Sequence, residues 1–323
     1  MMVSRRCFTA AATLVGLASS SSLFGKMATT QSIPLGVHTF SFHQIREGGL
    51  TAVDEIVAST KQLGLSSVEL FEPQLRPFVM PEGYYKRWWV AAHPTDKDAT
   101  APSTPPSPES RQAQREQLRQ WRLHPPEGYF AEVRRRFARG GIEIYAYNLS
   151  FDATMTDDEI DAGFEQAKIL GAKIITSSST LSQAKRLALF AEKHRTLVAF
   201  HNTTSDDPDR LVTPEAFKNV LDMSHWYRIN LDVAHFFAAG YDPVSVIDQQ
   251  HQHIASLHLH DRKGHNGVSV PIGEGGTPLR EVLALLRDRH WPIPSFYELE
   301  HVGSGLPISE IERDLRSIRA LEI

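Results

Sequence analysis

The chain has 323 residues, of which 41% are hydrophobic and 22% charged, and its formal net charge is −4. This length supports one large domain or two small ones with a sizeable core. The mildly acidic balance argues against a nucleic-acid-binding face, and the single cysteine excludes both a disulfide scaffold and a CxxC metal knuckle. The one apolar run stands near the start, which excludes a polytopic membrane protein.

The first residues predict an export signal. Arg5 and Arg6 precede an uncharged stretch of apolar and small residues from Thr9 to Gly25, which is the order of a signal peptide. The arginine pair resembles the twin-arginine (Tat) signal, although an ordinary secretory signal or an uncleaved anchor shares part of this pattern. We expect residues 1–28 to be the signal peptide, the Tat translocon to be a partner during export, and the mature protein to be periplasmic.

Eight short apolar or β-branched runs follow, with helical patterns between them. We expect strands at 35–42, 67–72, 142–147, 172–177, 197–201, 228–232, 254–260 and 295–300. Helices are expected at 50–63, 126–139, 157–170, 181–193, 214–223, 243–250, 278–289 and 308–320. This strict alternation predicts an α/β fold, a (β/α)8 TIM barrel over residues 33–323. A doubly wound sheet is the alternative, but the first strand is not followed by a glycine-rich phosphate loop.

One connection is too long for an ordinary loop between a strand and a helix. Residues 73–123 are rich in Pro, Ser and aromatic residues, and we interpret them as an insertion after the second strand, on the catalytic face. Trp88 and Trp121 within it are candidate substrate-binding residues, because aromatic rings suit the apolar faces of sugars. The alternative is that these tryptophans only pack the insertion onto the barrel.

Potential metal ligands stand at the ends of four consecutive strands: His201, Asp232, His258 and Glu298. A single His at a strand end is more often a hydrogen-bonded structural residue than a ligand. In a (β/α)8 enzyme, however, the chemistry is built from the carboxyl ends of the strands, so these four side chains should converge. Two imidazoles and two carboxylates suit one divalent ion of Mn, Co, Zn or Fe, with Mg possible but less suited.

These residues and their spacing resemble the xylose isomerase-like (sugar phosphate isomerase/epimerase) barrels, in the exported, Tat-signal branch. The motifs that carry the resemblance are Gly36–Phe42, Val68–Glu72, His201-Asn202, Asp232-x-x-His235, His258-x-x-Asp261, Pro271–Gly275 and Glu298-x-Glu300. The resemblance implies one divalent metal ion at His201, Asp232, His258 and Glu298, and chemistry on sugars next to a carbonyl. Glu69, Asn202, Lys263 and Glu300 are the expected substrate-binding residues beside the tryptophans.

The sequence departs from the family at the fifth strand. Epimerases of this family place a Glu there, which faces the Glu of the eighth strand, whereas this chain has His201. The catalytic candidates are therefore His235 and His260 as neutral imidazole bases, together with Glu298. Alternatively, His235 caps a helix or loop, and His260 supports the metal ligands from behind. The Gly273–Gly276 run is expected to form a tight turn rather than a phosphate site.

The leading hypothesis is a metal-dependent sugar isomerase or epimerase that abstracts a proton next to the carbonyl of a keto-sugar. A lyase that acts on 3-keto-glycosides by β-elimination starts with the same proton abstraction and remains open, as does a non-catalytic sugar-binding barrel. An abasic-site nuclease shares this barrel but needs a basic groove and a richer ligand set. The expected partner is therefore a small sugar or glycoside and not a nucleic acid, and an oligomer is possible.

Overall fold

The computed structural model describes residues 33–45, 48–77, 107–301, 303 and 306–321. The predicted signal peptide and Trp88 lie outside these described residues, and so does the middle of the predicted insertion. Within the described part of the chain, the helices are all too short or too polar to cross a membrane.

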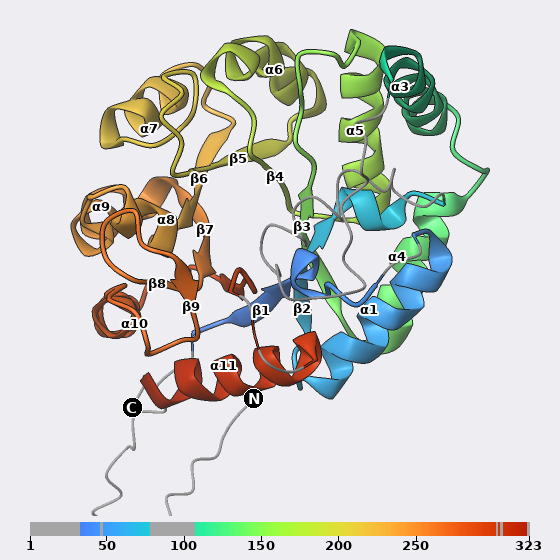
Figure 1. The fold of residues 1–323 in the computed structure, drawn as a ribbon. Coiled ribbons are helices and arrows are strands. Elements are labelled where there is room, and N and C mark those ends of the chain that lie inside the picture. Colours follow the sequence, from blue (N-terminus) through green and yellow to red (C-terminus); the bar gives the residue numbers. More distant parts are fainter. Residues whose placement is uncertain (1–32, 46–47, 78–106, 302, 304–305, 322–323) are drawn as a thin grey trace, which may run out of the picture. The chain divides into compact units, whose positions relative to one another are not determined.

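Eight parallel strands close into a barrel, which confirms the predicted (β/α)8 fold (Figure 1). Around the barrel the order is β1-β10-β7-β6-β5-β4-β3-β2. Ser295 closes the ring because it pairs with Leu35 of β1 on one side and with Leu257 of β7 on the other. The strands are β1 (Leu35–His38), β2 (Ser67–Phe71), β3 (Glu143–Asn148), β4 (Ile174–Ser177), β5 (Leu197–His201), β6 (Tyr227–Asp232), β7 (Ile254–Leu259) and β10 (Ser295–Tyr297).

Helices surround the barrel, and eight of them agree with the predicted ranges to within a few residues (Figure 1). Their ends follow local sequence signals. Thr156 and Glu159 form a capping box at the start of α5, and Gly171 ends that helix in the left-handed conformation. The eight are α1 (Leu50–Gln62), α4 (Tyr129–Gly140), α5 (Asp157–Leu170), α6 (Leu181–His194), α7 (Pro214–Leu221), α9 (Pro243–Gln250), α10 (Leu279–Arg289) and α11 (Pro307–Leu321).

Several shorter elements were not expected from the sequence. The first strand ends at His38, because the chain turns into the 3-10 helix η1 (Thr39–Ser41), and β10 ends at Tyr297 rather than at Glu300. After β2 and β6 come the 3-10 helix η2 (Glu72–Leu75) and the short helix α8 (Val233–Ala238). The 3-10 helix η3 (His251–His253) precedes β7, and β8 (Asp261–Arg262) pairs with β9 (Ser269–Val270) as a small antiparallel sheet.

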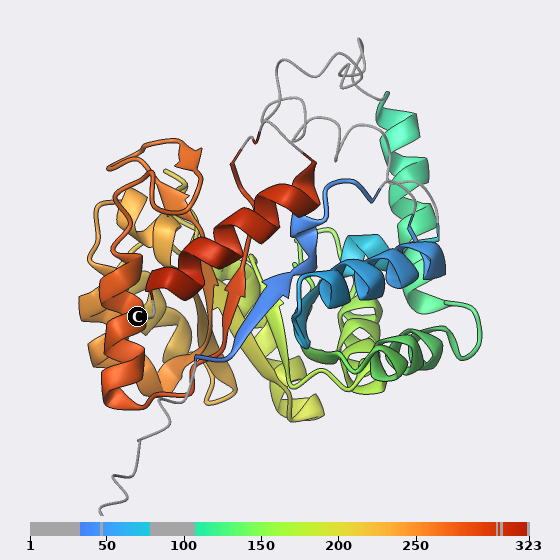
Figure 2. The same cartoon turned by 90° about the horizontal axis from the view of Figure 1, so that it is seen from below.

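The predicted insertion contains a helix. The helix α3 (Pro108–Leu123) begins at Ser107, whose side chain accepts a hydrogen bond from Ser110 N. Its sequence is mostly polar, so it lacks the apolar periodicity by which a helix is recognised. Figure 2 shows that α3 lies beyond the ends to which the barrel strands point.

The interior of the barrel is polar at one level and apolar at the next. Side chains of a strand that are two residues apart share a face, so Asn148, Thr176 and His201 follow Ala146, Ile174 and Ala199 on the inner faces of β3, β4 and β5. Ala146, Ile174 and Ala199 form a small buried apolar cluster. Asn148, Thr176 and His201 are buried polar residues at the carboxyl ends of β3, β4 and β5, the end at which the candidate site lies.

Candidate metal centre

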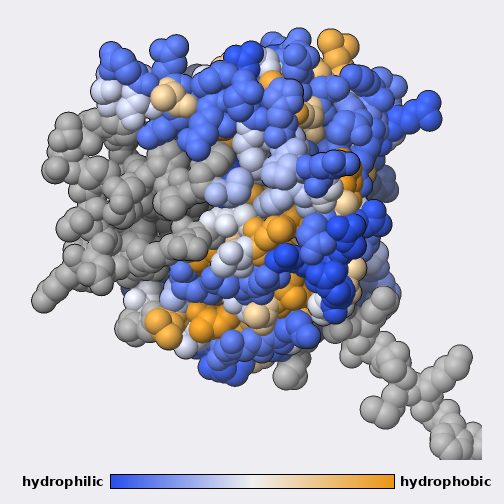
Figure 3. All heavy atoms as spheres, turned by 90° about the vertical axis from the view of Figure 1, so that its right-hand side faces the viewer, coloured by the Kyte–Doolittle hydropathy of each residue, from blue (hydrophilic) through white to orange (hydrophobic). Residues whose placement is uncertain are grey.

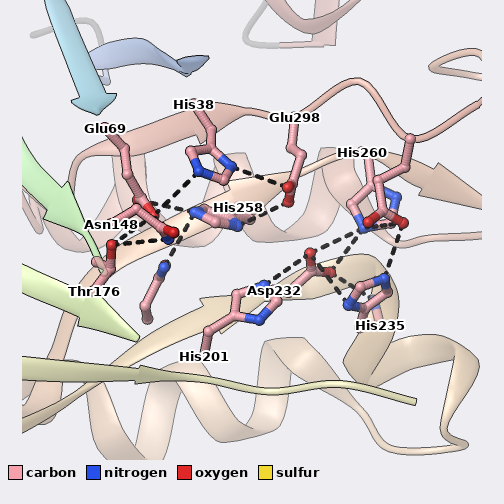
Figure 4. A network of polar contacts seen from close by, with 12 residues as sticks. His38, Glu69, Asn148, Thr176, His201, Asp232, His235, His258, His260 and Glu298 are labelled. Atoms are coloured by element: carbon pink, nitrogen blue, oxygen red, sulfur yellow. Dashed lines mark hydrogen bonds and ion pairs between the residues drawn. The ribbon is translucent and has the colours of Figure 1, made fainter. Parts of the chain in front are cut away.

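His201, Asp232, His258 and Glu298 meet at the carboxyl end of the barrel, as Figure 4 shows. They come from the ends of β5, β6 and β7 and from the residue that follows β10. Each offers one ligand atom, and these atoms all lie within 4.8 Å of one another. All four side chains are buried, so the structure brings together the four residues that the sequence places at successive strand ends.

The atoms that face one another in this cluster are poorly satisfied by hydrogen bonds. Within the described part of the chain, His201 Nε2 is buried without a hydrogen-bond partner, and the buried His258 Nδ1 and Glu298 Oε2 contact each other only as an ion pair without hydrogen-bond geometry. His258 Nδ1 lies 2.9 Å from Glu298 Oε2, and His201 Nε2 lies 3.5 Å from Asp232 Oδ2. Buried polar atoms without partners are costly, so a cation that accepts their lone pairs would stabilise this arrangement. The residues therefore fit a divalent metal ion.

The protonation states also suit a cation. Burial lowers the pKa of His201, which favours the neutral imidazole that binds metals. Burial opposes ionisation of Glu298, but the adjacent His258 and His38 hold its pKa well below the ordinary value. Burial likewise opposes a charge on His258, yet the carboxylates of Glu69 and Glu298 raise its pKa well above the ordinary value. A protonated His258 thus compensates the charges of the Glu69 and Glu298 carboxylates. A bound metal ion would supply this positive charge instead.

Glu69 lies directly behind His258. Its Oε2 is 2.9 Å from His258 Nε2, while its Oε1 accepts hydrogen bonds from Thr176 Oγ1 (2.6 Å) and Asn148 Nδ2 (2.7 Å). Burial opposes its charge, but His258 and His38 lower the pKa of Glu69 to about 2. Its exposed fraction is 0%, so it is placed to orient His258 rather than to touch a sugar as the sequence analysis expects.

His38 is a further member of the site, which was not expected from the sequence. It ends β1, its Nδ1 lies 2.9 Å from Glu298 Oε1, and its ring stacks on that of His258 with centroids 5.0 Å apart. The signal that could have found it is the one used for the four ligands, a histidine at a strand end. Asn148, Thr176 and Asn230 were also missed, because their contacts with Glu69 and His258 join strands that are distant in the sequence.

Asp232 is held from three directions. His260 Nε2 lies 3.0 Å from both of its carboxylate oxygens, and the backbone N–H of His235 donates to its Oδ1 at 2.6 Å. The side chain of Asn202 accepts from Asp232 N and donates to Asp232 O. These contacts place His260 behind a metal ligand and occupy Asn202 with backbone groups, so both residues position Asp232. Burial opposes ionisation, but His235 and His260 lower the pKa of Asp232 well below the ordinary value.

His235 and Glu300 form a pair beside the cluster. His235 Nε2 lies 3.0 Å from Glu300 Oε2, and 12% and 19% of the two side chains remain exposed. Burial lowers the pKa of His235, but Asp232 and Glu300 outweigh it and raise this pKa to about 10. The contacts therefore favour an imidazolium, a proton donor, over the neutral base that the sequence analysis expects.

The other candidate residues differ in their surroundings. Lys263 is exposed at the tip between β8 and β9, and Trp121 is buried against Tyr129 and Phe130 of α4, which agrees with a packing role. The expected turn at Gly273–Gly276 is confirmed, because Gly273 N and Gly275 N both donate to Asp261 Oδ2 at 2.9 Å. These amides are occupied, so the turn does not offer them to a phosphate.

Comparisons with known proteins agree with the fold. The family model described as a xylose isomerase-like TIM barrel matches residues 57–321. No curated protein matches the chain.

Solved structures share the fold at low sequence identity. The IolI protein with a bound zinc atom is 14% identical, with a TM-score of 0.60, over 90% of this chain and 98% of that one. A sugar phosphate isomerase/epimerase from Parabacteroides distasonis is 14% identical, with a TM-score of 0.55, over 91% and 97%. The probable 3-DHS dehydratase AsbF from Bacillus anthracis is 15% identical, with a TM-score of 0.56, over 88% and 99%.

Proposed function

Because the chain belongs to the xylose isomerase-like TIM barrel family, we propose that it is a metal-dependent enzyme that moves a proton next to the carbonyl of a keto-sugar. The observation that carries this proposal is the convergence of His201, Asp232, His258 and Glu298 within 4.8 Å of one another. Binding of one divalent ion by these four residues would polarise a sugar carbonyl and make the neighbouring C–H more acidic.

The side chains around the cluster have two roles, which are positioning of the metal ligands and proton transfer. Glu69 and His38 orient His258 and Glu298, while His260 and Asn202 hold Asp232. The pair of His235 and Glu300 keeps a proton at His235 Nε2, at a place where both side chains are partly exposed. A proton held there can pass to a substrate oxygen or carbon, and Glu298 is the candidate to accept the proton from the substrate carbon.

The same first step leads to two outcomes. Isomerisation or epimerisation returns the proton to carbon, whereas elimination uses an acid to protonate a departing group on the adjacent carbon. One feature favours elimination from a 3-keto-glycoside as the second candidate. His201 replaces the carboxylate that would face Glu298, and the His235–Glu300 pair supplies an acid instead. The similarity to a probable dehydratase supports this candidate, since a dehydration is also an elimination.

The experiment combines metal analysis with proton exchange. The purified protein should contain about one equivalent of Mn, Co, Zn or Fe, and its removal by a chelator should abolish activity. Keto-sugars and 3-keto-glycosides are incubated with the enzyme in D2O and followed by NMR, which reports both C–H exchange and the products. A protein without metal and without exchange on any of these compounds would instead be a sugar-binding barrel. We also propose that it acts in the periplasm after export by its twin-arginine signal.

A further inference from the structure

A cleft of about 860 Å³ opens beside the candidate metal centre. It lies between α3 and the loops that follow β3, β4 and β5, and its volume is in the upper part of the range for small-molecule sites. Two of its lining residues reach the centre. Asn148 donates a hydrogen bond to Glu69, and Ser178 Oγ lies 3.4 Å from His201 Nδ1. The cleft therefore adjoins the site where the reacting carbon would lie.

Arginines dominate the charge of this cleft. In the described part of the chain, five arginines line it: Arg76, Arg111, Arg115, Arg122 and Arg210. Arg111 and Arg115 belong to α3, which lies on the face drawn in Figure 3, where hydrophilic residues predominate. Arg210 donates to the backbone oxygen of Ser178, so its guanidinium is held next to the passage towards His201.

Arg122 is the most deeply placed of these arginines. It is only 4% exposed, and its ion-pair distances to Glu72 and Glu159 are both 3.5 Å. Its Nε is buried and faces Glu72 Oε1 at 3.5 Å, which is too long for a full hydrogen bond. A buried guanidinium that is held only by such long contacts is costly, so an anion that reaches it from the cleft would relieve this cost.

The charges leave room for a single negative group. The five guanidiniums share the lining with three carboxylates, those of Glu72, Asp152 and Asp209. The carboxylate of Glu159 neutralises one more of these positive charges, since it pairs with both Arg115 and Arg122. Among the described residues, one positive charge remains in excess, which matches one carboxylate better than a phosphate dianion.

We propose that this cleft binds a carboxylate of the substrate, so that the preferred substrate is an acidic keto-sugar or glycoside, such as a uronate. Arg122 anchors the carboxylate, with Arg111 and Arg210 at the rim, and the reacting carbon lies at the metal centre. The location of the reacting carbon rests on the proposed function, whereas the recognition of the carboxylate rests on the cleft alone.

Direct binding to the full-length, metal-loaded protein tests this proposal. D-glucuronate, D-glucose and inorganic phosphate are titrated by calorimetry at low and high salt. We expect D-glucuronate to bind about tenfold more tightly than D-glucose, with a preference that weakens at high salt. Arg122→Gln should lower the affinity for D-glucuronate about tenfold, and Arg111→Gln roughly threefold, while D-glucose binding stays unchanged. Arg119→Gln is the matched control, because Arg119 lies on α3, pairs with Glu116 and does not line the cleft.

Three results would overturn the proposal: equal binding of D-glucuronate and D-glucose, tighter binding of phosphate, or a preference that Arg111→Gln leaves unchanged relative to Arg119→Gln. Arg111 is exposed, so its variant keeps the test valid if Arg122→Gln does not fold. The two proposals also fail separately. Arginine-dependent carboxylate binding without C–H exchange on any keto-sugar contradicts only the proposed reaction, and exchange without a carboxylate preference contradicts only the proposed cleft.

Discussion

His235 lies on α8 and Glu300 follows β10, yet His235 Nε2 is 3.0 Å from Glu300 Oε2. Burial raises the pKa of Glu300, but His235 and His260 outweigh it and lower this pKa. The carboxylate is therefore the acceptor of the pair, and the imidazole keeps the proton. This relationship makes His235 the best-placed acid of the candidate site.

His235 should act as the proton donor of the reaction. His235→Gln should lower the rate of the catalysed reaction by about 10²–10⁴-fold, because a well-placed proton donor is lost, while metal content stays unchanged. Rates are measured by NMR and metal by elemental analysis on the same sample. His253→Gln, at an exposed position, is the control. An unchanged rate would place the acid elsewhere.

Glu298 should be required for metal binding. Glu298→Gln removes the charge of one of the four converging groups, so we expect the bound metal to fall well below one equivalent and activity to fall with it. The metal-dependent part of thermal stability should shrink as well, since binding to the folded state stabilises it. Glu274→Gln, in an exposed turn, should keep full metal content. Full metal content in Glu298→Gln would remove Glu298 from the ligand set.

A substitution of Glu69 distinguishes two roles for this residue, positioning of His258 and contact with the substrate. Because Glu69 is fully buried and contacts His258 Nε2, Glu69→Gln should weaken metal binding by roughly 10- to 100-fold. Activity at saturating metal should largely recover with little change in KM for the sugar. A raised KM with unchanged metal affinity would instead support the substrate contact expected from the sequence.

The sequence predicted the barrel and the four converging groups because both follow from local patterns. His201, Asp232, His258 and Glu298 each end an apolar run, and parallel strands place such ends on one face. The roles of the surrounding residues could not be predicted in this way. Glu69 is 189 residues from His258, and His38 is 260 residues from Glu298, so only the closed barrel brings each pair into contact. The helix α3 was missed for a different reason, since its polar sequence hides the period of a helix.

Export is tested with the arginine pair. Arg5→Lys combined with Arg6→Lys should prevent accumulation in the periplasm, because the Tat route requires the twin arginines, and leave the folded protein in the cytoplasm. Cell fractionation with an antibody against the chain measures the distribution. Lys26→Gln, in the same predicted segment, serves as the control. Unchanged periplasmic accumulation of the double variant would exclude the Tat route.

The attachment of α3 to the barrel depends on Glu159. Glu159 is fully buried, accepts from Arg115 of α3 at 2.7 Å and completes the capping box of α5. Burial opposes its charge, but Arg115 and the backbone N–H of Thr156 lower the pKa of Glu159 from 4.5 to about 2. A carboxylate whose pKa is lower in the folded state stabilises the protein above its unfolded pKa, and this stabilisation disappears as the pH falls through its folded pKa.

Glu159→Gln should therefore lower the free energy of unfolding by about 1–3 kcal/mol at pH 7. The difference from the natural protein should be complete above about pH 4.5 and shrink towards pH 2. Urea denaturation at several pH values measures it. Glu116→Gln on α3 is the matched control, because Glu116 is half exposed and pairs with Arg119 at the surface, where an ion pair contributes little. A loss of stability that does not depend on pH would mean that Glu159 acts through packing rather than through its charge.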